Sequence, residues 1–193
     1  MAMLLRPSGA LSRPARARHP ATRPPVPETA PVREGVRLAV DVGSVRVGVA
    51  RSDPGGILAS PLTVLRSGPR GPGKRAELDE LATLAAGADA IEVIVGLPTS
   101  LSGREGTAAA AARGFAAELA GQLASIPVRL VDERFTTTQA HDALRRGGKD
   151  SRARRSTVDA AAAAVLLQAA LDTERATGRP PGQLVALTGG ADA

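Results

Sequence analysis

The sequence predicts an α/β protein in which helices flank a mixed β-sheet. Three segments rich in apolar residues come first, at 36–42, 45–51 and near 57–65, and the first two repeat valine and leucine with the period of two that is typical of strands. Helical and strand patterns then alternate as far as residue 176. Consecutive strands followed by alternating helices and strands indicate one sheet with antiparallel and parallel neighbours.

Each later element carries a local signal of its own. Leu78, Leu81 and Leu84 recur at helical spacing, and "IEVIVGLP" is an apolar run that ends in glycine and proline, as expected of a buried strand. The segments "SDPGG" and "RSGPRGPG" predict a turn and a loop. After the third strand we expect a helix at 74–86, a strand at 91–98, a helix at 106–124, a strand at 126–133, and helices at 137–146 and 157–176.

The chain of 193 residues divides into one predicted domain and two tails. Residues 1–34 are rich in arginine and proline, show no apolar period, and are expected to be a disordered N-terminal extension. This extension is a variable segment, the product of a start codon assigned too early, or a basic arm that touches phosphates. The folded domain is expected at 35–177, and a flexible C-terminal tail at 178–193.

Composition excludes several kinds of protein. There is no cysteine and there are only two histidines, so disulfides are excluded and a zinc site is disfavoured. The sequence contains no run of 18 apolar residues, so no membrane span is predicted, and the N-terminus lacks the apolar core of a secretory signal. We therefore expect a cytoplasmic protein without membrane contact. With no Trp or Tyr, base stacking cannot be the main mode of any nucleic-acid binding.

Three carboxylates from distant parts of the chain are expected to converge. Asp41 ends the first strand, Glu133 ends the last strand, and Asp159 begins the final helix. Ligands of open α/β sheets bind at the carboxyl ends of parallel strands, where these acids would meet. Three bare carboxylates repel one another unless a cation lies between them, and oxygen ligands select Mg²⁺ or Mn²⁺. Two such ions could clamp the attacking and leaving oxygens of a phosphodiester.

Each acid also has a structural explanation. Asp41 could be a turn residue before Gly43, and Glu133 could pair with Arg134 or lie in solvent. Asp159 could close a capping box whose N-cap is Ser156. Gly43 and Gly48 could serve turns and close packing, or could let a nucleic-acid backbone approach Asp41.

A basic loop is expected between Glu133 and Asp159, at 145–155, where six of eleven residues are Lys or Arg. If the acids form a site, this loop overhangs it and its cations suit phosphate contacts; the alternative is an ordinary solvated charge run. Arg46 in the second strand could also reach a phosphate, and a second basic segment lies at 66–75. The basic loop contributes the candidate nucleic-acid-binding residues Arg145, Arg146, Lys149, Arg152, Arg154 and Arg155.

Four motifs in order give the chain a specific resemblance. They are "DVGSVRVGVARSD" (41–53), "VGLPTSLSG" (95–103), "DERFTT" (132–137) and "VDAAAAAVLLQ" (158–168). This sequence resembles the YqgF family, also called RuvX, over about residues 35–176. The resemblance implies a ribonuclease-H-like fold, with a five-stranded mixed sheet whose second strand is antiparallel and with helices on both faces.

The resemblance also implies an activity. It points to a divalent-metal nuclease, an enzyme hydrolysing phosphodiester bonds, whose Asp–Glu–Asp site falls on Asp41, Glu133 and Asp159. Arg46 matches the basic residue usual in the first motif, while the third motif brings Arg134 and Thr137. The lysine common before the last motif is replaced here by "RRST".

The implied role is processing of the 5′ end of pre-16S rRNA, with two Mg²⁺ or Mn²⁺ ions as the expected cofactors. One alternative is resolution of Holliday junctions in DNA, which would require a homodimer to supply two active sites. Another is a non-catalytic ribosome-assembly factor that binds nucleic acid without cutting it. An ATP-binding domain of the actin and sugar-kinase type is disfavoured because the chain lacks a second lobe.

Overall fold

The computed structural model describes residues 32–68, 75–99, 106–123, 125–133 and 152–186, and in the last stretch the side chains are described from Val158 onward. Residues 35–66 form a three-stranded meander, after which helices and strands alternate. The elements in chain order are β1 (Arg37–Val42), β2 (Arg46–Ser52), β3 (Ala59–Arg66), α1 (Ala76–Gly87), β4 (Glu92–Leu97), α2 (Thr107–Leu123), β5 (Val128–Asp132), α4 (Arg152–Thr177) and β6 (Gln183–Leu184).

The strands form one mixed sheet in the order β3-β2-β1-β4-β5-β6. β1 is antiparallel to β2 and parallel to β4, and β4 is parallel to β5. The first five strands therefore have the predicted ribonuclease-H-like arrangement, with an antiparallel second strand. The sixth, β6, was not predicted: it pairs antiparallel with β5 and lies within the segment assigned to the C-terminal tail.

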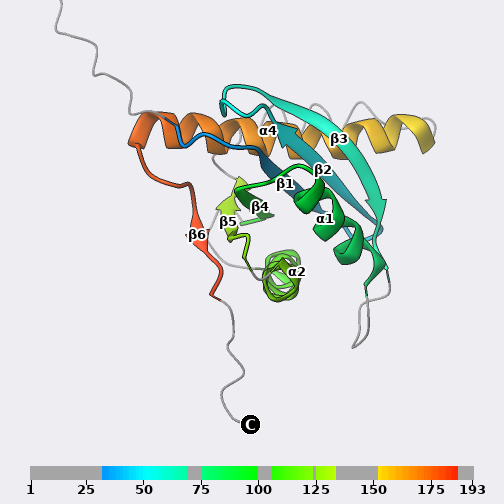
Figure 1. The fold of residues 1–193 in the computed structure, drawn as a ribbon. Coiled ribbons are helices and arrows are strands. Elements are labelled where there is room, and N and C mark those ends of the chain that lie inside the picture. Colours follow the sequence, from blue (N-terminus) through cyan, green and yellow to red (C-terminus); the bar gives the residue numbers. More distant parts are fainter. Residues whose placement is uncertain (1–31, 69–74, 100–105, 124, 134–151, 187–193) are drawn as a thin grey trace, which may run out of the picture.

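Helices cover both faces of the sheet, α1 and α2 on one and α4 on the other (Figure 1). The alternation within β1 explains the two layers, because Leu38 and Val40 pack towards α1 and α2 whereas Ala39 packs towards α4. The layer beneath α4 is built largely from alanine and leucine, so this helix lies close to the strands. Within the residues that the structure describes, no helix combines the length and apolar character needed to cross a bilayer.

Two boundaries differ from expectation in ways that matter for function. α4 begins at Arg152, five residues before the predicted start, so the end of the expected basic loop belongs to a helix. At the other end of the domain, the described chain already begins at Val32, and Arg33 is held by ion pairs to Glu92 and Glu174. The helix expected at 137–146 lies outside the described residues.

A buried charge network joins the start of the sheet to the end of α4. Arg37 in β1 is fully buried, and it donates hydrogen bonds of 3.1 and 3.2 Å to the carboxylate of Glu174, which Arg33 also contacts. Glu92 in β4 accepts from Arg33 and from Arg129, each at 2.9 Å. Buried charges are tolerated when they are paired and hydrogen-bonded in this way, so the network fixes the first strand against the last helix.

Candidate active site at the carboxyl edge of the sheet

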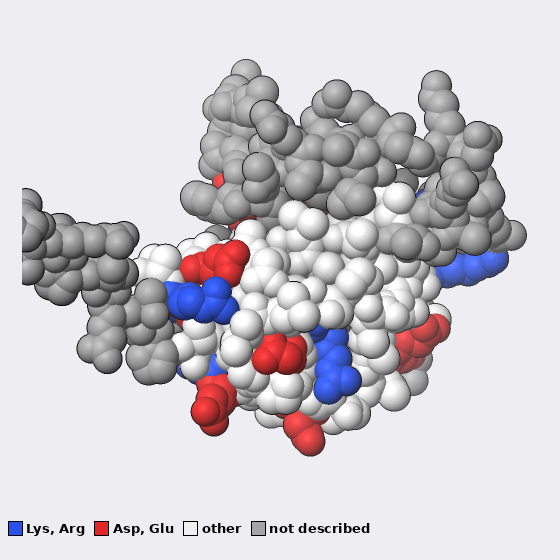
Figure 2. All heavy atoms as spheres, turned by 90° about the horizontal axis from the view of Figure 1, so that it is seen from above, with Lys and Arg blue, Asp and Glu red and all other residues white. Residues whose placement is uncertain are grey.

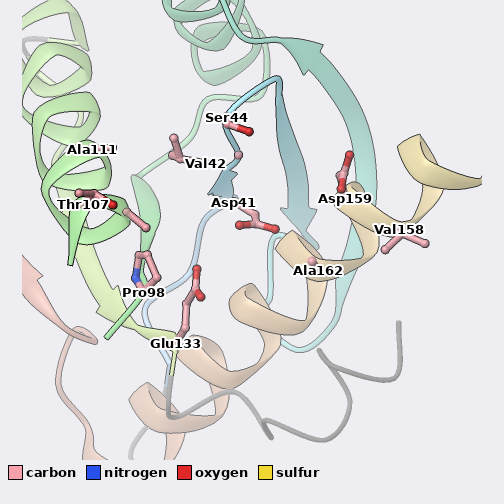
Figure 3. A pocket seen from close by; sticks show the side chains of 12 residues that line it. Asp41, Val42, Ser44, Pro98, Thr107, Ala111, Glu133, Val158, Asp159 and Ala162 are labelled. Atoms are coloured by element: carbon pink, nitrogen blue, oxygen red, sulfur yellow. The ribbon is translucent and has the colours of Figure 1, made fainter. Parts of the chain in front are cut away.

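A pocket of about 410 Å³ opens where the parallel strands end, and residues of both α2 and α4 line it. The three predicted acids, Asp41, Glu133 and Asp159, all line it (Figure 3). The rest of the wall comes from the turn between β1 and β2, from Pro98 after β4, from the first turns of α2, and from Ala162 of α4. The structure thus brings together side chains that lie 92 and 118 residues from Asp41 in sequence.

The pleat of the strands explains why two of the acids face α4. Successive side chains of a strand point to opposite faces, so Asp41 lies on the same face as Ala39, which packs in the α4 layer. Glu133, directly after β5, shares its face with Val131, which packs in the same layer. The apolar pattern that fixes the register of β1 and β5 therefore also aims both carboxylates towards α4.

Glycines on the neighbouring strands make room for the acids. Gly48 pairs with Asp41 across β1 and β2, and a Cβ atom at Gly48 would overlap the backbone carbonyl of Asp159. A Cβ atom at Gly96 would lie 2.7 Å from Oε1 of Glu133 and 3.1 Å from Leu166. Gly48 therefore permits α4 to approach the sheet, which is a packing role and not the predicted approach of a nucleic-acid backbone.

Asp159 is not a capping residue. It is the eighth residue of α4, so the structural alternative, a capping box with Ser156 as the N-cap, is excluded because the helix begins a turn earlier. The Asp159 carboxylate instead accepts a hydrogen bond from Nε of Arg46 at 2.5 Å, and both side chains are 30% exposed. Arg46 itself is placed by a tight turn, in which the backbone N–H of Gly43 donates to the carbonyl of Arg46 at 2.9 Å.

The carboxylates do not yet form a complete set of metal ligands. In Figure 3, Glu133 points towards Asp41, whereas the carboxylate of Asp159 points away from both. Among the residues described, no three acidic or histidine side chains lie close enough to hold one ion. The donor atoms are nevertheless all carboxylate oxygens around one polar pocket, which is the donor chemistry of Mg²⁺ and Mn²⁺. The site fits such an ion if Asp159 turns.

Most of the predicted nucleic-acid-binding residues cannot be placed in the pocket. Arg152, Arg154 and Arg155 belong to the first turn of α4, not to a loop, and their side chains are not described. In the second basic segment, Arg75 is buried and pairs with Glu77 and Glu118, so it is a structural residue. The candidates that lie outside the described residues are Arg134, Thr137, Arg145, Arg146 and Lys149.

The described residues on the face along which α4 runs show no strong charge of one sign. Figure 2 views the side of the molecule along which α4 runs, and the acidic and basic side chains visible there are interspersed. Near the pocket, the described residues contribute Arg46, which pairs with Asp159, and its exposed strand neighbour Arg66.

Some residues of the site were missed by sequence reasoning. Thr99 donates a hydrogen bond of 2.5 Å to Asp132, which ties the end of β4 to the end of β5 directly before Glu133. Thr107 at the start of α2 lines the pocket. Neither the hydrogen bond of Thr99 nor the position of Thr107 follows from a local pattern, because both depend on how distant segments pack. The "GLP" and "DER" motifs mark only the two strand ends.

Comparison with known sequences gives a consistent match. A family model described as "RuvX: Holliday junction resolvase" matches residues 35–173. A protein of Thermobifida fusca named "Putative pre-16S rRNA nuclease" is 59% identical over 161 residues, covering 80% of this chain and 98% of its own. A protein of the same name from a Nocardioides species is 54% identical over 158 residues, with the same coverage.

Among solved structures, the chain is similar to RuvC of Thermus thermophilus in complex with a Holliday junction substrate. The TM-score is 0.44 at 18% sequence identity, over 72% of this chain and 95% of the RuvC chain.

Proposed function

The chain belongs to the RuvX family, and from this premise we propose that it is an endonuclease that hydrolyses phosphodiester bonds with the help of divalent metal ions, acting on the 5′ end of pre-16S rRNA. The observation that carries the proposal is the gathering of Asp41, Glu133 and Asp159 around one pocket. No structural need of the fold explains three acids there, because carboxylates that share a site repel one another.

The three acids would hold Mg²⁺ or Mn²⁺, and such ions supply a polarised water and stabilise the charge that develops on the phosphate oxygens. Asp41 lies centrally in the pocket and would be shared between two ions. Glu133 would hold one of them and orient the attacking water, while Asp159 would complete the second site. The water oxygen bonds to phosphorus as the bond to the 3′ oxygen breaks, which leaves a 5′-phosphate and a 3′-hydroxyl.

Two helix ends support binding of a polyanion near these acids. The first turn of α2 lines the pocket, and the N-terminal end of a helix carries a partial positive charge. The first turn of α4 contains arginines and no acidic residue, an arrangement that is unfavourable for an isolated helix. Phosphates bound beside α4 would offset that cost, so the arginines are better explained by substrate contact than by helix stability.

The choice of substrate rests on the relatives. The most similar proteins reported above are named for pre-16S rRNA, which favours RNA. The description of the family favours branched DNA as a second candidate. A junction resolvase would act as a homodimer, since the two cleaved strands are related by a two-fold axis. A cytoplasmic location suits both substrates.

The experiment that tests the proposal is a cleavage assay with two substrates. End-labelled pre-16S rRNA and a four-way DNA junction are incubated with wild type, Asp41→Asn and Asp172→Asn, in Mg²⁺, Mn²⁺ or EDTA. Asp172 is a matched control because it is an exposed acid of α4 outside the pocket. We expect cutting that requires metal, is retained by Asp172→Asn, and falls by more than about 10-fold in Asp41→Asn, because changes to the outer shell of a metal site already cost about 10- to 100-fold.

The substrate that is cut faster identifies the role. Binding of either nucleic acid without cutting, unchanged by EDTA and by Asp41→Asn, would overturn the proposal. The chain would then be better explained as a ribosome-assembly factor that binds nucleic acid without hydrolysing it.

A further inference from the structure

The ion pair between Arg46 and Asp159 has an unusual position for a structural contact. It joins β2 to α4 at the rim of the pocket, and its two side chains are each 30% exposed. Asp159 is one of the three pocket acids, yet its carboxylate is directed away from Asp41 and Glu133 (Figure 3). The Arg46 guanidinium therefore binds the Asp159 carboxylate, which the proposed site needs as a metal ligand.

A second arginine stands beside the first. Arg46 in β2 pairs in register with Arg66 in β3, so the two side chains leave the same face of the sheet. Like charges directly opposite each other are unfavourable, and Asp159 offsets this repulsion on the Arg46 side. If Asp159 turned towards Asp41, two neighbouring guanidinium groups would be left next to the pocket. A phosphate group is an anion that such a pair binds well.

We propose that Arg46 is a positioning residue that acts as a latch: it holds Asp159 out of the metal site until a backbone phosphate of the substrate takes its guanidinium. The proposal rests on the proposed function, because it assumes that the pocket acids bind metal. Substrate binding would then release Asp159 to complete the site, so metal and nucleic acid would bind cooperatively. The latch would keep the site incomplete while no substrate is present.

The energetics allow such an exchange. A partly exposed ion pair such as this one contributes little net stability, because water solvates both partners well when they separate. Arg37 and Glu174 make the opposite case on the same helix, since both are buried and neither can leave its partner for solvent. The backbone of Asp159 is fixed against Gly48, so only its side chain has to turn.

The test measures metal binding by the free protein, with Mn²⁺ as the probe and the electron spin resonance of unbound Mn²⁺ as the readout. Arg46→Gln removes the latch. Arg66→Gln is the matched control, because it removes the same charge at the register neighbour without an ion pair of its own to Asp159. Working at physiological ionic strength limits the general effect of charge to about 8 Å. Asp41→Asn reports whether the pocket binds metal at all.

We expect Arg46→Gln to bind Mn²⁺ about three- to fivefold more tightly than wild type, the range that release of an exposed pair allows. Arg66→Gln should gain less than half of that factor. Equal affinity of Arg46→Gln and wild type, equal gains in the two arginine variants, or weaker binding by Arg46→Gln would overturn the latch while Asp41→Asn still abolishes binding. Undiminished binding by Asp41→Asn would instead overturn the metal site, and the latch with it.

Discussion

Helix α4 has acids near both of its ends, and two of them, Glu174 and Asp159, are held in contrasting ways. Glu174, near its C-terminal end, is 2% exposed and accepts hydrogen bonds of 2.8–3.2 Å from Arg33 and Arg37. Asp159, near the other end, is 30% exposed and is held by Arg46. Both acids are paired with arginine, so pairing alone does not distinguish a structural carboxylate from a functional one.

The difference lies in burial and in the number of partners. Burial opposes ionisation of Glu174, but hydrogen bonds from Arg33 and the charges of Arg37 and Arg33 outweigh it and hold the pKa of Glu174 below its usual range. Breaking that cluster would strand Arg37 in the interior. Asp159 can exchange its partner for water, a metal ion or another cation at small cost. The end of the sheet at Glu174 is therefore fixed by buried ion pairs, and we call it the clamped end. At the other end, which we call the open end, Asp159 is free to exchange its partner.

The largest expected effect comes from the clamped end. Glu174→Ala should lower the free energy of unfolding by about 3–5 kcal/mol, because removal of one member leaves a buried, uncompensated guanidinium. Chemical denaturation of the variant and of Asp172→Asn, which changes a solvent-exposed acid two residues earlier, measures the difference. A loss no larger than that of Asp172→Asn would show that the buried network does not clamp the helix.

A smaller loss is expected where α4 crosses β2. Gly48→Ala places a methyl group against the backbone of Asp159, so the helix must shift, at a cost of about 1–3 kcal/mol. Gly114→Ala is the control of opposite sign: it lies exposed within α2 with no atom near the new methyl, and should stabilise by about 0.5–1 kcal/mol. Thermal unfolding of both variants checks this, and a neutral Gly48→Ala would mean that α4 is not closely packed there.

Acid should weaken the contribution of Glu174 to stability. Because the pKa of Glu174 is lower in the folded protein than its ordinary value of 4.5, its carboxylate stabilises the fold above that pH, and the contribution is lost as the pH falls through the folded pKa. The stability advantage of wild type over Glu174→Gln should thus be constant near neutrality and shrink below about 4.5. Denaturant titrations across this range test it; an advantage that grows in acid would contradict the assignment.

The smallest expected change in stability is at the pocket. Asp159→Asn breaks the partly exposed ion pair with Arg46 and should alter the free energy of unfolding by only about 0–1 kcal/mol. The measurement is the same denaturant titration as for Glu174→Ala. A loss comparable with that of Glu174→Ala would mean that both ends of α4 are structural, and the contrast between them would disappear.

Much of the fold could be predicted from the sequence because its signals are local. The period of two in β1 and β2 and the leucine spacing of α1 each identify an element without reference to the rest of the chain. The start of α4 was predicted too late because "RRST" and "RARR" look like a loop followed by a cap, whereas the helix begins at Arg152. β6 was missed because two residues cannot show a period, and only pairing with β5 makes them a strand.

The candidate site also combines residues that local sequence signals predict with contacts that they do not. Asp41 and Glu133 could be predicted because each ends a recognisable strand, and Asp159 because it begins the helix expected to pack back across the same edge; the resemblance to the family assigns the same three acids. The pairing of Arg46 with Asp159 joins residues 113 positions apart, and no local pattern predicts it. The space that Gly48 and Gly96 leave for Asp159 and Glu133 is likewise a property of packing between distant segments.

The most direct test of the account is metal binding by the two acids of α4. Isothermal titration of Mn²⁺ into Arg46→Gln, in which Asp159 is not held by the ion pair, and into the same protein carrying Asp159→Asn or Glu174→Gln is carried out below the melting transition of each protein. The account predicts that Asp159→Asn loses affinity for Mn²⁺ while Glu174→Gln, although less stable, binds it as the parent protein does. Unchanged binding by Asp159→Asn, or an equal loss in both variants, would contradict the claim that the open end of the sheet is the catalytic one.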